Sequence, residues 1–196
     1  MKPTLLDGAT PIDPAWERDL LISVATMGEL NELEQQNIVA ALAWAENSTR
    51  LDSRLISVDG LRLLHRRMFE QVWWWAGTFH SRNLNLGIEW GYITTQVQNL
   101  CDDVAYWIER GTYGWIETAV RFHHRLVSIH PFFNGNGRHA RIAANLLLRY
   151  HGRPDLLWGR ANLATNGAVR DAYIAALKRA DQEDIEPLVA FAQSGE

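Results

Sequence analysis

The sequence contains one cysteine, Cys101, in 196 residues, so no disulfide can form within the chain and a reducing compartment is expected. It has no window approaching the roughly 20 apolar residues that a helix needs to cross a bilayer. Residues 1–14 lack the long apolar core of a signal peptide. The formal net charge of −4 argues against a general nucleic-acid binder. We therefore expect a cytoplasmic protein that binds neither membranes nor nucleic acids.

Internal repeats and low-complexity segments are also absent, and the apolar content of 47% and charged content of 21% are ordinary for a globular protein. A chain of this length is most often one domain. Apolar residues recur at three- and four-residue intervals from Trp16 to Phe191, which predicts a mainly helical fold. Asn31 and Glu34 have the spacing of a capping box at the start of one of these helices.

The helical spacing is interrupted between Ala76 and Thr94. Four consecutive residues in this interval alternate polar and apolar side chains, and glycines follow them: Asn83, Leu84, Asn85 and Leu86. Such alternation next to turn residues predicts a short β-hairpin. The sequence as a whole therefore predicts an all-α protein with one small hairpin.

The residues with the most evident chemistry lie in one twelve-residue run, His130-Pro131-Phe132-Phe133-Asn134-Gly135-Asn136-Gly137-Arg138-His139-Ala140-Arg141. A glycine-rich turn that opens a helix presents free backbone N–H groups and the positive end of the helix dipole. Such a turn binds phosphate or another anion.

Three side chains extend this prediction. Arg138 and Arg141 are one helical turn apart, and two guanidinium groups suit an extended polyphosphate. His130 precedes the turn and is the side chain best suited to take a proton near neutral pH. The alternative to catalysis is that His130 is a structural histidine. The alternative to phosphate binding is that the two arginines form surface salt bridges. A metal site is disfavoured because the local histidines lack a ligand spacing of i, i+4; they are His123, His124, His130 and His139.

The run resembles the signature of the Fic family, His-x-Phe-x-(Asp/Glu)-Gly-Asn-Gly-Arg-x-x-Arg. The stretch Trp73-Trp74-Trp75-Ala76-Gly77 also resembles the family's lead-in to its flap, a hairpin that overhangs the phosphate site. The resemblance implies a Fic-fold helical bundle: a single domain over residues 1–196, with an N-terminal helical segment (1–56) and a Fic core (57–192). It implies transfer of AMP from ATP to a hydroxyl of a target protein with release of diphosphate, and ATP and Mg²⁺ as the bound species.

The resemblance also assigns roles. His130 would take the proton from the target hydroxyl, Phe132 would anchor the loop in the core, and His123 would be structural. The flap (about residues 82–94), with Asn83, Leu84, Asn85 and Leu86, would dock an extended segment of the target protein. Phosphate oxygens would be held by Gly135, Asn136, Gly137, Arg138 and Arg141, the last at the γ-phosphate. A glycine at 137, where related kinases tend to carry lysine, favours AMP transfer.

One departure from the signature concerns the metal. Asn134 stands where the family's acidic Mg²⁺ ligand is usual, and an amide oxygen can coordinate this cation but supplies no charge. Because Mg²⁺ would then bind more weakly, the protein could instead be a catalytically weak module with a binding or regulatory role. Another Fic-type phosphate transfer and removal of AMP are further alternatives. The asparagine and the short length also resemble a bacterial subgroup, mobile mystery protein B.

A second feature concerns inhibition. Many Fic proteins carry an inhibitory helix with (Ser/Thr)-x-x-x-Glu-(Gly/Asn), whose Glu pairs with the second signature arginine. Residues 42–47 keep Glu46 and Asn47 but have Leu42 at the first position. Glu46 is thus a candidate inhibitory residue that would neutralise Arg141; an inhibitory partner chain is the alternative. The oligomeric state is left open.

Overall fold

The computed structural model describes residues 14–160 and 167–195. These residues form two compact units, one made of residues up to Leu55 together with Asp59–Phe79, the other of Ile56–Val58 and the chain from His80 onward. Gly8 and Pro11 predict an irregular lead-in over residues 1–13, a segment that lies outside the described residues. Within the described part of the chain, no helix is both long and apolar enough to span a bilayer.

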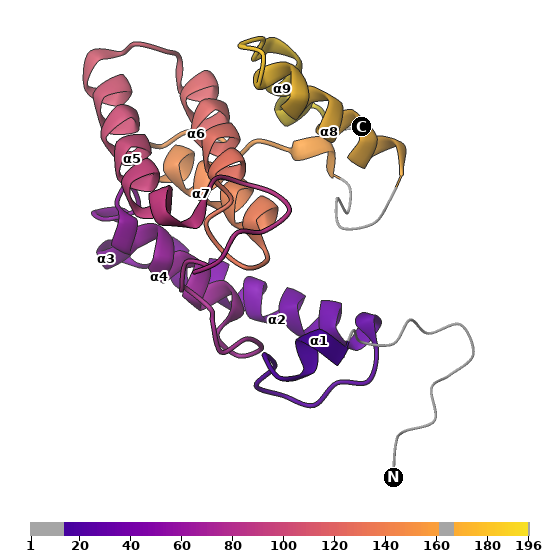
Figure 1. The fold of residues 1–196 in the computed structure, drawn as a ribbon. Coiled ribbons are helices and arrows are strands. Elements are labelled where there is room, and N and C mark those ends of the chain that lie inside the picture. Colours follow the sequence, from indigo (N-terminus) through magenta and orange to yellow (C-terminus); the bar gives the residue numbers. More distant parts are fainter. Residues whose placement is uncertain (1–13, 161–166, 196) are drawn as a thin grey trace. The chain divides into compact units, whose positions relative to one another are not determined.

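The first unit contains four helices within the described residues, namely α1 (Pro14–Glu17), α2 (Met27–Glu46), α3 (Thr49–Asp52) and most of α4 (Val58–Phe69) (Figure 1). α2 begins at a capping box formed by Thr26 and Glu29. The capping box predicted at Asn31 and Glu34 is therefore wrong. Glu34 is buried inside α2, where its carboxylate accepts a hydrogen bond of 2.6 Å from the Trp73 indole N–H.

The tryptophan-rich segment that follows α4 forms part of the core of this unit. Trp73 and Trp75 are buried and stack with ring centroids 5.0 Å apart, whereas Trp74 is 59% exposed. The segment ends at Gly77, whose backbone N–H donates to Nδ1 of the buried His65 on α4. This bond fixes the place at which the chain leaves the unit.

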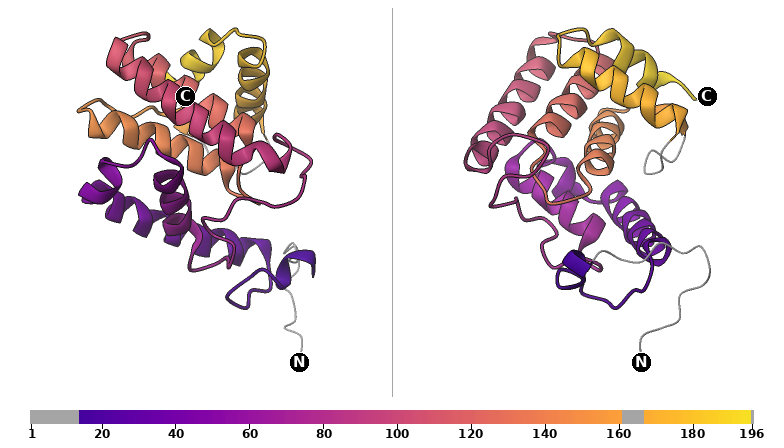
Figure 2. Two further views of the ribbon diagram at one scale, coloured as in Figure 1. Left: turned by 60° about the vertical axis from the view of Figure 1, so that its left-hand side comes forward. Right: turned by 45° about the vertical axis from the view of Figure 1, so that its right-hand side comes forward.

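The second unit is built from α5 (Ile93–Arg110), α6 (Trp115–Ile129), α7 (Asn136–Tyr150), α8 (Ala168–Ala180) and α9 (Glu186–Gln193). Two short 3₁₀ segments accompany them, η1 (Trp90–Tyr92) and η2 (Trp158–Arg160). α6 packs against α5 and α7, and α8 packs against α9 (Figure 2). The mainly helical architecture predicted from the sequence is confirmed.

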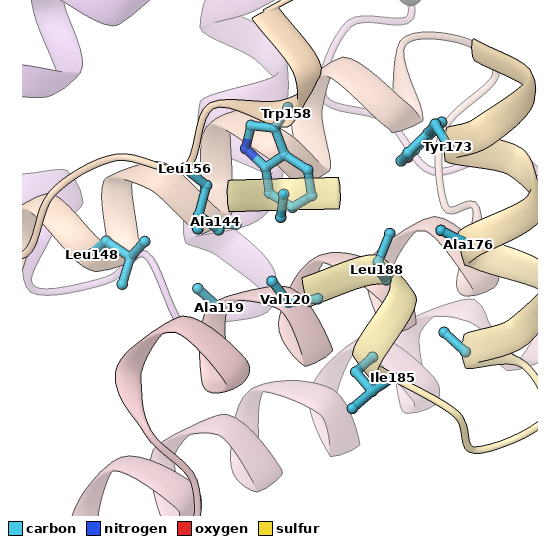
Figure 3. Packing of buried hydrophobic residues seen from close by; sticks show 12 residues of the cluster. Ala119, Val120, Ala144, Leu148, Leu156, Trp158, Tyr173, Ala176, Ile185 and Leu188 are labelled. Atoms are coloured by element: carbon cyan, nitrogen blue, oxygen red, sulfur yellow. The ribbon is translucent and has the colours of Figure 1, made fainter. Parts of the chain in front are cut away.

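A cluster of buried apolar residues joins α6 and α7 to the C-terminal helices (Figure 3). It includes Val120 from α6, Ala144 from α7, Tyr173 from α8 and Leu188 from α9. The cluster holds α8, and with it the hydroxyl of Tyr173, at a fixed place beside α6 and α7.

The predicted hairpin is not confirmed. Residues 81–89 contain no strand, and η1 and α5 follow directly. The backbone N–H of Ile88 donates to the Ile129 carbonyl at the end of α6, and that of Trp90 donates to the Asn83 side chain. These N–H groups therefore do not pair with a second strand, and residues 81–89 of the flap form an irregular loop.

Candidate functional site

His130 ends α6 in the left-handed conformation, with φ 56° and ψ 55°. This conformation is uncommon for residues other than glycine, and it turns the chain from α6 into the loop before α7. Partial burial lowers the pKa of His130 below its usual value, and the nearby His80 lowers it further. The neutral imidazole, the form that can accept a proton, is therefore the form present at neutral pH.

The loop from His130 to α7 is fixed by its own side chains. Phe132 is fully buried and its ring meets His139 edge-on, with centroids 5.0 Å apart. The Asn136 side chain accepts the Phe132 N–H at 2.9 Å and donates to the Phe132 carbonyl at 2.7 Å. Because both polar groups of the Asn136 side chain bind this backbone, the residue shapes the loop, and the phosphate contact predicted for Asn136 stays a prediction that only its backbone N–H could meet.

The start of α7 has the features of an anion site. Its N-cap is Gly135, with φ 77°, and no side chain caps the helix. The first N–H groups of a helix have no carbonyl partners within it, and the helix dipole adds positive potential there. A Cβ placed on Gly137 would lie 3.7 Å from an Nη atom of Arg141. The glycine backbone and this guanidinium therefore adjoin one another.

Arg141 is held by Tyr173 of α8, which in turn contacts His123 of α6. Its guanidinium carbon lies 5.7 Å from the centre of the Tyr173 ring, and it shares a hydrogen bond with the Tyr173 hydroxyl. That hydroxyl lies 2.9 Å from Nε2 of His123. Burial lowers the pKa of His123 well below its usual value, with Arg141 contributing. A neutral His123 can accept the Tyr173 proton, which leaves the phenolic oxygen as an acceptor for Arg141.

The two signature arginines, Arg138 and Arg141, are close enough for their charges to interact. Burial lowers the pKa of Arg141, and the charge of Arg138 lowers it further. Arginine nevertheless stays protonated in proteins. A polyphosphate placed between these cations would relieve their repulsion.

The flap lines a hollow of about 380 Å³ together with His130 and Phe133. Its flap residues are Arg82, Asn83, Leu84, Asn85 and Leu86. The structure thus brings the predicted docking residues and the predicted base to one hollow.

His80 ties the flap to the His130 loop. Its backbone N–H donates to the Pro131 carbonyl at 3.0 Å, and its two ring nitrogens contact the carbonyls of His130 (3.1 Å) and Arg82 (2.7 Å). His80 and Tyr173 are site residues that no feature of the sequence predicts. Neither belongs to a motif, and each reaches the site only through the fold.

Asn134 and Glu46 are the remaining predicted residues. The Asn134 Oδ1 accepts the Gly135 N–H at 2.7 Å, so the expected Mg²⁺ ligand is a neutral oxygen that already has a donor. This residue does not by itself make a protein-held Mg²⁺ site. Glu46 is the last residue of α2, in the first unit, and is exposed; its inhibitory role stays a prediction.

The part of the chain that carries this site matches a known protein family. The sequence model of the Fic/DOC family matches residues 55–148, which include the tryptophan segment, the flap and the His130–Arg141 loop. The chain carries a domain of the Fic/DOC family. Glu46 and Tyr173 lie outside the Fic match.

Individual relatives agree with the family match. The chain is 29% identical to protein adenylyltransferase fic-1 of Caenorhabditis elegans over 69% of its own length and 26% of that protein's length. It is 37% identical to protein adenylyltransferase Fic of Drosophila yakuba over 39% of its length and 14% of that protein's. The chain therefore spans about a quarter or less of the length of these curated relatives.

Solved structures support the same fold. Fic-1 (residues 134–508) from C. elegans superposes with a TM-score of 0.63 at 27% identity, covering 88% of this chain and 50% of that one. The Bartonella tribocorum effector BepC, solved with bound AMPPNP, gives a TM-score of 0.69 at 15% identity and covers 96% of this chain and 93% of its own. At that identity the second likeness concerns the Fic fold alone.

Proposed function

We propose that this chain is a protein adenylyltransferase that moves AMP from ATP to a hydroxyl side chain of a target protein. The observation that carries the proposal is the half-buried His130 imidazole, which lines the flap hollow directly before the anion-binding start of α7. The names of the curated relatives support the same activity.

The chemistry balances with the residues present. The target oxygen would form a bond to the α-phosphorus of ATP as its proton passes to His130, and the bond from that phosphorus to the bridging oxygen would break. Diphosphate would leave with the bonding electrons. Stabilisation of the charge on the phosphates usually contributes most to such transfers. Here it would come from the N–H groups that begin α7, from Arg138 and from Arg141.

The flap supports a protein substrate. Its residues form one wall of the hollow beside His130, and three of its apolar side chains are exposed, Leu86, Trp90 and Tyr92. Exposed aromatic residues of this kind are enriched at protein interfaces. We propose that the target segment lies along the flap with its hydroxyl in the hollow.

None of the steps proposed for AMP transfer depends on a protein-held Mg²⁺. Mg²⁺ usually keeps several waters and binds largely through substrate phosphates, so we propose that it enters with ATP. The neutral Asn134, hydrogen-bonded to Gly135, favours one alternative, a Fic module with weak catalysis and a binding or regulatory role. Other phosphate transfers, including AMP removal, are the second alternative.

Labelled ATP separates these functions. The chain and its Glu46→Gly variant would be incubated with cell lysate, Mg²⁺ and ATP carrying ³²P at the α- or the γ-position. Protein labelled from the α-position alone supports AMP transfer, and a larger signal in Glu46→Gly supports inhibition by Glu46. Label from the γ-position would instead indicate a kinase. No label with either variant favours the binding module, and loss of AMP from a premodified target would indicate the reverse reaction.

The Tyr173 contact gives a separate prediction. Tyr173→Phe keeps the ring against Arg141 but removes the hydroxyl, so Arg141 loses its acceptor and its fixed orientation. A hydrogen bond of this kind contributes about 1 kcal/mol net, and ATP should bind about fivefold more weakly. Calorimetry with ATP and with AMP, which lacks the γ-phosphate, would test it: AMP affinity should change little. An equal loss for both ligands would contradict a role through Arg141.

A further inference from the structure

A second hollow lies in the first unit, away from the Fic signature. It measures about 220 Å³ and is lined by residues of α3, of the turn after it and of α4. Figure 1 labels both helices. Four of the seven lining residues are arginines and one is acidic: Arg50, Arg54, Arg62 and Arg66, with Asp59. A chain with a formal net charge of −4 thus gathers four cations around one small space.

Glycine brings the two pairs of arginines together. A Cβ on Gly60 would lie 1.9 Å from the Arg54 carbonyl oxygen, a distance that no side chain tolerates. Only glycine therefore lets the first turn of α4 lie against the turn that carries Arg54. As a result, Arg50 and Arg54 line the same hollow as two arginines one helical turn apart on α4, Arg62 and Arg66.

One of these arginines is held in place. Nε of Arg62 donates to the Gly77 carbonyl at 2.9 Å, and its guanidinium carbon lies 5.6 Å from the centre of the Phe79 ring. This fixes the side chain before any ligand arrives. Arg66 is exposed and can turn toward a ligand. Like charges spaced four apart on a helix destabilise it, so intrinsic helix stability does not explain this pair.

We propose that this arginine hollow binds a compact ligand with several phosphate groups, independently of the nucleotide site. Guanidinium groups match phosphate oxygens through paired N–H donors. Four of them against one carboxylate suit an anion with more than one negative charge. The same chemistry is offered by a soluble oligophosphate and by a phosphorylated lipid headgroup, and the test separates these sources.

The test uses inorganic diphosphate and the full chain. Arg138→Gln and Arg141→Gln are introduced first, so that the start of α7 keeps only its backbone N–H groups and contributes little to the signal. Calorimetry should then still show saturable diphosphate binding that weakens as salt is added. Adding Arg50→Gln and Arg66→Gln should weaken it by about tenfold or more, because two charge-assisted contacts are lost.

Arg67→Gln is the matched control. Arg67 also lies on α4, but it pairs with Glu70 and covers Trp44 instead of lining the hollow; its replacement should leave diphosphate affinity unchanged. Arg54→Gln provides a second variant of the hollow, with a single change. Thermal unfolding checks that each variant folds. Diphosphate binding that survives both hollow variants, or no saturable binding before they are made, would overturn the proposal.

Vesicles identify the source of the phosphate. Co-sedimentation with vesicles containing phosphatidylinositol bisphosphate, lost in Arg50→Gln/Arg66→Gln, would indicate a headgroup site. Diphosphate binding without vesicle binding would indicate a soluble ligand. The same double variant should keep the AMP transfer of the unmodified chain, so failure of the hollow and failure of the proposed enzyme are distinguishable.

Discussion

His130→Ala is expected to lower the rate of AMP transfer by about 10²–10⁴-fold, the usual effect of removing a well-placed general base. Binding of ATP should survive, because the proposed phosphate contacts come from α7 and its arginines. The variant also replaces a left-handed histidine by alanine, so the fold must be compared by circular dichroism. Single-turnover transfer of α-labelled AMP, together with ATP affinity from calorimetry, measures the two quantities separately.

His124→Ala is the matched control. His124 lies on the same helix, but its ring contacts Asp181 at 2.8 Å and does not line the flap hollow. Its replacement should leave the transfer rate nearly unchanged. A His130→Ala variant as fast as the unmodified chain would remove His130 from the mechanism.

The pH profile offers an independent check on the same residue. The base must be neutral to accept a proton, and partial burial together with His80 lowers the pKa of His130. Protonation should therefore reduce the rate only as pH falls below about 6.5, the ordinary value for histidine. The residual rate of His130→Ala should lack this acid limb. An acid limb centred above 6.5 would contradict a neutral histidine in the free enzyme.

The residues that the sequence could identify are those close together along the chain. The His130–Arg141 loop contains the proposed base, the proposed anion-binding turn and both arginines, so helical spacing and a motif were enough to find them. Tyr173 and His80 lie 32 and 50 residues from the groups they contact, Arg141 and His130. Their contacts depend on how helices and loops pack, and no local pattern encodes that.

The wrong capping box and the unconfirmed hairpin are also explained by contacts between residues far apart in the sequence. Thr26–Glu29 and Asn31–Glu34 both have capping-box spacing, but only the first caps α2. Glu34 lies inside the helix, where its carboxylate is buried and accepts a hydrogen bond from the Trp73 indole. The flap has the alternation of a hairpin, yet its backbone donors bind the end of α6 and the Asn83 side chain. In both cases the local pattern is present, but tertiary contacts use the same residues differently.

Gly87→Ala is expected to lower AMP transfer by about 10²-fold, because small misplacements near reacting groups cost about that much. Gly87 has φ 93°, and a Cβ there would lie 2.5 Å from Cβ of His130 and 2.8 Å from the Ile129 carbonyl. Alanine must therefore push the flap away from α6 and disturb both His130 and the wall of the hollow.

Gly91→Ala controls for the loss of a flap glycine. A Cβ on Gly91 would have nothing within 4 Å, and this residue lies in η1, only four positions along the chain. The Gly91 variant should keep normal transfer. The Gly87 variant should also bind ATP normally, because α7 is untouched, while its apparent KM for the target protein rises. Normal transfer by Gly87→Ala would mean that the flap can move from His130 without consequence, and the proposed docking of the target along it would fail. Because the clash arises between the flap and the end of α6 alone, this pair of variants tests the target side of the site separately from the phosphate side.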